Sequence, residues 1–152
     1  MFNTLLGTLR PHTAVPPVAA APMEKQIIVT PLTARARLSF PNGLAYCGQV
    51  IQIVPWRKSL IVDSIRFEGA SSDGQGFLKV SSMLAGEARC YIVPATRNCS
   101  AIDADGVCGS ASIDLLADPG TAVIVTYFRG FSAGSRGLTN VTVSLAGRYA
   151  EL

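Results

Sequence analysis

The chain has 152 residues and a formal net charge of +3, with 49% hydrophobic and only 15% charged residues. That length suits one domain with a hydrophobic core, and the charged fraction lies well below the roughly 25% typical of globular domains. Three net charges are too few for a nucleic-acid protein, which usually carries a clustered basic stripe. We therefore expect one domain that retains apolar surface for a partner.

The first 25 residues differ in composition from the rest. Four prolines between Pro11 and Pro22 remove backbone donors and favour extended backbone. Before them come apolar residues at helical spacing, followed by an arginine: Phe2, Leu5, Leu6, Leu9 and Arg10. A segment of this kind cannot build a core, so we expect residues 1–25 to form an assembly arm and residues 26–152 to form the domain.

Beyond the arm, short runs of β-branched and aromatic residues are interrupted every eight to twelve residues by turn-forming residues. In Leu32–Phe40, apolar residues alternate with polar or basic ones, the period of a strand with one buried face. The other predicted strands are Gln26–Thr30, Gln49–Val54, Ser59–Phe67, Gly76–Leu84, Cys90–Val93, Ser110–Leu116, Ala122–Phe128 and Leu138–Tyr149. Eight or nine such strands predict an all-β, antiparallel sandwich.

Several segments between these runs have the composition of turns and loops. Pro41–Gly43, Asp105-Gly106 and Asp118–Gly120 are predicted turns, and the last should start the strand that follows it. Residues 68–76 and 130–137 are rich in Gly and Ser and are predicted loops.

The sequence shows no recognisable active site. His12, the single histidine, lies in the Pro-rich arm, where a catalytic triad would have no rigid support. Asp103–Gly106 resembles the start of a calcium loop, but the remaining ligands do not follow. We therefore expect no enzyme activity, no cofactor and no metal site; a small hydrolase would need paired carboxylates that the sequence cannot place.

Four cysteines, Cys47, Cys90, Cys99 and Cys108, allow three complete disulfide pairings, and the sequence does not choose among them. Without a Cys-x-x-Cys pair or a nearby histidine they do not match a zinc site. Buried free thiols are one interpretation. The sharper hypothesis is a Cys99–Cys108 disulfide, which would stabilise the fold by about 2–3 kcal/mol in the chain-entropy account.

Trp56 is the single tryptophan, placed between Pro55 and the cations Arg57 and Lys58. It suits stacking on a sugar or a base, and a carbohydrate-binding module would combine it with Tyr46, Tyr91 or Tyr127 on one exposed face. The other interpretation is a half-buried aromatic at the edge of the sandwich or in a subunit contact.

With its leader, its strand rhythm and its closing run Thr139–Tyr149, the chain resembles the small jelly-roll virion proteins of bacteriophages, which form vertices, pentons and spikes or decorate capsids. The resemblance implies a jelly-roll sandwich that forms trimers or pentamers and binds neighbouring capsid proteins through the arm. It also implies a place in the virion after assembly in the host cytoplasm, with no specific nucleic-acid partner. The apolar tip of the arm is a candidate for membrane contact. The alternative function is a carbohydrate-binding or receptor-binding β-sandwich module.

Overall fold

The computed structural model describes residues 28–40, 44–71, 76–97, 106–129 and 139–151. These residues form strands without any helix, which confirms the all-β prediction. The strands are β1 (Val29–Phe40), β2 (Tyr46–Ile53), β3 (Lys58–Ala70), β4 (Gly76–Leu84), β5 (Glu87–Pro94), β6 (Thr96–Arg97), β7 (Gly106–Ala117), β8 (Ala122–Arg129) and β9 (Thr139–Glu151).

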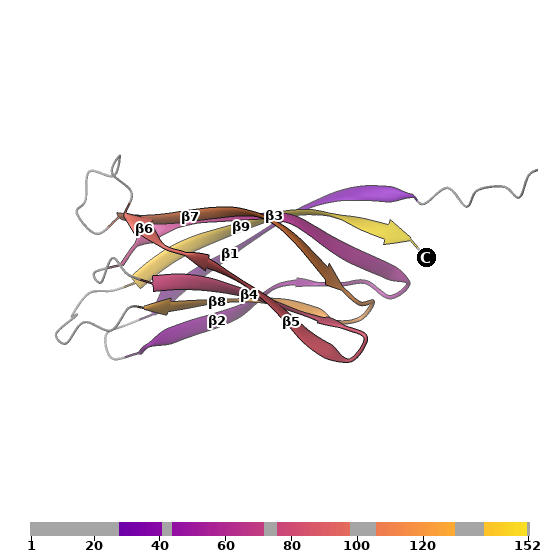
Figure 1. Ribbon diagram of the computed structural model, residues 1–152, viewed down its shortest axis with the longest axis horizontal. Coiled ribbons are helices and arrows are strands. Elements are labelled where there is room, and N and C mark those ends of the chain that lie inside the picture. The colour runs from indigo at the N-terminus through magenta and orange to yellow at the C-terminus, as the bar shows by residue number, and fades with distance from the viewer. Residues whose placement is uncertain (1–27, 41–43, 72–75, 98–105, 130–138, 152) are drawn as a thin grey trace, which may run out of the picture.

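The strands form two sheets that pack face to face (Figure 1). One has five strands in the order β1-β9-β3-β7-β6, and the other has four in the order β2-β8-β4-β5. Every pairing is antiparallel. If the two-residue β6 is set aside, each sheet has four strands, and the chain crosses repeatedly from one sheet to the other. This strand order is that of a jelly roll, which confirms the predicted fold.

The core lies between the sheets and is built by period-two alternation. Along β8, Val123, Val125 and Tyr127 are buried while the residues between them point outward. The Tyr127 ring meets Phe67 of the opposite sheet edge to face, with centroids 5.7 Å apart. Gly109 makes room for this contact, because a Cβ there would collide with the Phe67 ring.

Some strand boundaries differ from the prediction. β1 continues through Pro31 as one strand, which the sheet tolerates because β1 is an edge strand. Residues 68–70 were predicted as a loop but belong to β3, where Gly69 packs directly against the backbone of Asn140. The turn predicted at Asp105-Gly106 is wrong for Gly106, which is already the first residue of β7.

Candidate functional site

Three turns meet at the end of the sandwich where β2 finishes and β3 begins. The Val54 amide donates to the Thr121 carbonyl at 2.8 Å, and the Gly120 amide donates back to the Val54 carbonyl at 2.9 Å. The Ala85 amide of the β4–β5 turn donates to the Asp118 carboxylate at 2.6 Å. These bonds hold the three turns as one unit, which we call the turn end. The predicted turn at Asp118–Gly120 is confirmed here, directly before β8.

Trp56 projects from the turn end with 80% of its surface exposed. Its turn is closed by the Lys58 amide, which donates to the Pro55 carbonyl at 3.3 Å, and Arg57 has a positive φ of 67°. The indole lies against Gly120. Within this chain Trp56 is therefore not half-buried, as one interpretation expected, but points outward from a hydrogen-bonded turn.

The aromatic residues that a sugar-binding face would need do not gather around Trp56. Tyr127 is fully buried in the core, so it is no part of an exposed platform. Tyr46 begins β2 whereas Trp56 follows its end, so the length of that strand separates them. Tyr91 lies on the edge strand β5. A ligand that stacks on Trp56 would therefore not contact these three tyrosines.

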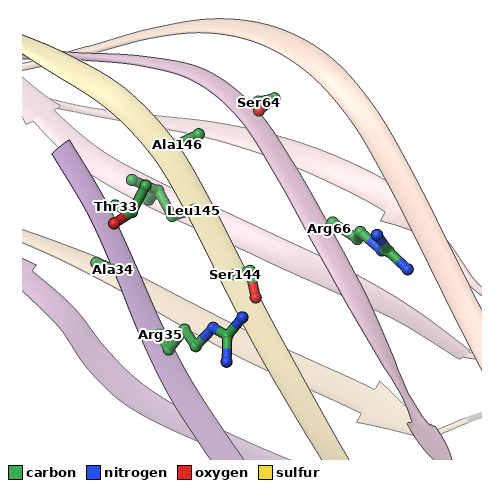
Figure 2. A pocket seen from close by; sticks show the side chains of 8 residues that line it. All are labelled: Thr33, Ala34, Arg35, Ser64, Arg66, Ser144, Leu145 and Ala146. Carbon is green, nitrogen blue, oxygen red and sulfur yellow. The ribbon is translucent and has the colours of Figure 1, made fainter. Parts of the chain in front are cut away.

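The outer face of the five-stranded sheet is polar and contains a shallow hollow of about 640 Å³. Arg35 of β1, Ser144 of β9 and Arg66 of β3 stand in one row across it. In Figure 2, Arg35 reaches over β9 towards Ser144, while Arg66 leans away from that strand. The Arg66 guanidinium lies 3.5 Å from the Glu68 carboxylate. The two guanidinium groups thus do not converge on a common point, and the hollow is best described as a solvated charged surface.

The outer face of the four-stranded sheet is apolar. Its exposed large side chains come from all four strands: Tyr46, Val50, Ile53, Met83, Ile92 and Ile124. We call this surface, together with the rings of Phe77 and Phe128, the apolar face. Lys79 of β4 is the one charged side chain among the outward-facing residues of these four strands.

One row of the apolar face is aromatic across three strands. Tyr46 of β2 pairs with Phe128 of β8, which pairs with Phe77 of β4. The Phe77 and Phe128 rings stack at 4.8 Å, and the Tyr46 and Phe128 rings lie 5.4 Å apart. Aromatic pairs of this geometry contribute about 0.5–1.5 kcal/mol beyond the burial of their area.

This face was not predicted from the sequence. A signal was present in the run Ala122–Phe128, in which both alternating sets of residues are largely apolar rather than one of them polar. A strand of that composition usually has both faces covered. Which residues of other strands join it depends on the sheet order, which the sequence alone does not show.

A buried arginine at the opposite end of the sandwich was not predicted from the sequence either. Arg129, at the end of β8, is 8% exposed and donates to the Leu44 carbonyl from Nε at 2.9 Å and from Nη2 at 2.7 Å. Its Nη1 lies 3.5 Å from the hydroxyl of the buried Thr139, which in turn lies 3.4 Å from that of Ser71. Arg129 therefore links Leu44, which precedes β2, to Thr139, the first residue of β9.

No disulfide joins any two of the cysteines within the described residues, Cys47, Cys90 and Cys108. Cys108 is half-buried on β7, with its Sγ 3.7 Å from the hydroxyl of Thr96. Cys99 lies outside the described residues, so the Cys99–Cys108 disulfide stays a prediction. The arm residues Phe2, Leu5, Leu6, Leu9 and Arg10 also lie outside them.

No group of three or more His, Cys, Asp or Glu side chains that could hold a metal ion occurs in the described part of the chain. Over the same ranges, no helix is long and apolar enough to cross a membrane. In comparisons with known proteins, no protein-family model and no curated protein matches the chain.

Proposed function

We propose that the chain is a structural subunit of a bacteriophage virion: a capsid-associated jelly-roll protein, of the vertex, decoration or minor capsid type, that docks through its N-terminal arm. The observation that carries the proposal is the strand order, β1-β9-β3-β7 against β2-β8-β4-β5. Viral capsid proteins are among the main users of this architecture, together with lectins and cupins.

The surface adds support to this proposal. A subunit of a shell must leave apolar area for its neighbours, and such an area lies on one whole sheet of this sandwich. The charged residues of the sandwich are concentrated on the five-stranded sheet, whose outer face would then contact solvent or a polar neighbour. The arm, with its own apolar residues, would supply a second attachment to the particle.

The proposal is tested by incorporation into particles. The full chain and a chain that begins at Lys25 are each produced during infection, and the purified particles are assayed for both. We expect the full chain in the particles, and the shortened chain folded but absent from them. Equal incorporation of both would reject the docking role of the arm, and absence of both would reject the virion role.

A second candidate function, binding of a glycan or a receptor, is favoured by Trp56 alone. An indole that is 80% exposed on a hydrogen-bonded turn suits stacking on a sugar ring. A glycan array with the full chain tests this candidate, with Trp56→Ala as the matched variant. Binding that is lost in the variant supports it, whereas binding that survives, or no binding at all, rejects Trp56 as the site.

A further inference from the structure

The two outer faces of the sandwich differ sharply in charge. The five-stranded sheet carries charged side chains on each of its long strands: Arg35, Arg37, Arg66, Glu68, Asp114 and Arg148. The apolar face carries only Lys79. Antiparallel sheets that face water usually place polar residues outward. The apolar face therefore has the composition of a surface that another surface covers.

The centre of the apolar face is made by Ile124 of β8. It pairs with Val50 of β2 on one side and with Ser81 of β4 on the other, and it is 40% exposed. The aromatic row of Tyr46, Phe128 and Phe77 lies towards one end of these strands. None of these residues lines the hollows described on the other sheet.

The size of the face limits what can cover it. Its strands have eight or nine residues each. With a rise of about 3.3 Å per residue and about 4.8 Å between strands, the face measures roughly 26 by 19 Å, or about 500 Å² in plan. Two faces of this size would bury about 1,000 Å² together, close to the lower limit for a specific interface. One extended segment would cover only a strip of it, so a second sheet is the better fit.

We infer that the apolar face of one copy packs against the apolar face of a second copy, sheet on sheet. Of the two outer faces, the apolar face can be covered by its own copy with one charged side chain from each copy, Lys79, whereas the other face would bring its arginines together. A contact of a surface with its own copy has two-fold symmetry. The assembly should therefore contain an even number of copies: two, or twice the trimer or pentamer that the resemblance implies.

Lys79 is the residue that opposes such a contact. It stands between Thr126 of β8 and Ile92 of the edge strand β5. When the face is covered, its ammonium group must reach water past the edge of the sheet, because a buried unpaired charge is costly. Removing this charge should therefore strengthen the association of two copies, whereas adding a charge to the face should weaken it.

The experiment is sedimentation equilibrium of the purified full-length chain and three variants. Ile124→Glu should weaken association about 100-fold or more, because each pair would bury two unpaired carboxylates. Lys79→Leu should strengthen it about tenfold. The matched control is Leu116→Glu, which makes the same change at a residue that is 39% exposed on the outer face of the other sheet. It should change the association by less than about twofold.

A second measurement does not depend on the variants. Cys90 lies on the apolar face, paired with Ser81, and its thiol is free. Its labelling by a maleimide should slow as the chain associates. An odd number of copies, equal effects of Ile124→Glu and Leu116→Glu in folded variants, or a monomer at tens of micromolar would overturn the inference. A monomer in which Cys90 is nevertheless protected would mean that another part of the same chain covers the face. None of these results changes the strand order on which the virion proposal rests, and incorporation into particles tests that proposal separately.

Discussion

The indole of Trp56 lies across Gly120, so that a Cβ at Gly120 would be 2.9–3.0 Å from three atoms of its ring. Gly120 has a φ of +74°, which lets the turn after Pro119 close with the Thr121 amide donating to the Asp118 carbonyl at 3.2 Å. The glycine therefore has two roles, in the turn and under the indole. The most exposed aromatic residue described is supported by a backbone that cannot accept a side chain without moving it.

Gly120→Ala should lower the free energy of unfolding by about 1 kcal/mol, because alanine is strained at positive φ. It should also shift the fluorescence emission of Trp56, since the added methyl group displaces the indole. Thermal unfolding and emission spectra check the two effects separately. The matched control is Gly86→Ala, where φ is +78° and nothing lies within 4 Å of the added Cβ. A similar emission change in both variants would contradict the contact.

Arg129→Lys should destabilise the fold by about 1–3 kcal/mol, because an ammonium group cannot replace the two guanidinium N–H groups that both donate to the Leu44 carbonyl oxygen. Urea unfolding followed by circular dichroism measures the change. Arg35→Lys, on the exposed outer face of the other sheet, should leave the midpoint nearly unchanged. Equal stability of the Arg129 variant and the parent chain would show that this side chain does not fasten the end of the sandwich.

The ionisation of Tyr149 should contribute to the loss of stability at alkaline pH. Burial raises its pKa above the usual 10.0, although the hydrogen bond from Gln52 at 2.7 Å acts in the opposite direction. Because the folded-state pKa is the higher one, this contribution to stability is fully present below about pH 10 and is lost as the pH rises through the folded-state pKa. Melting temperatures from pH 8 upward should thus fall less steeply for Tyr149→Phe. The same alkaline loss in both proteins would contradict this assignment.

The fold was predictable because its signals are local. In the segment Leu32–Phe40, the alternation assigns Ala36 and Leu38 to the core, and both are buried. The turn at Asp118–Gly120 was also readable, since proline and glycine there suit a turn with a positive φ. The β4–β5 turn was not, because Ala85 takes a φ of 52° that alanine rarely adopts.

The candidate surfaces were less predictable because they depend on pairing between distant strands. Tyr46, Phe77 and Phe128 form a row only because β8 lies between β2 and β4. Arg129 looks like a surface arginine at the end of a strand, but in the fold it is buried and contacts Leu44 and Thr139. The exposure of Trp56 depends on the contact between its turn and the turn of Gly120, 64 residues later in the chain, and a local sequence pattern does not show such a contact.

Stability measurements on Trp56→Ala separate a structural from a binding role for this residue. Because the side chain is 80% exposed, its removal should change the free energy of unfolding by less than about 1 kcal/mol. Urea unfolding checks this value. A larger loss would mean that the indole stabilises the turn end, and its exposure would then not indicate a binding surface.

We propose that this chain is a structural component of a virus particle, and the protein composition of purified particles measures this directly. Quantitative mass spectrometry of particles from the source should find the chain in a fixed ratio to the major shell protein, at the copy number of a vertex, decoration or minor capsid protein. Its absence from the particles, or a trace amount that varies between preparations, would contradict the claim.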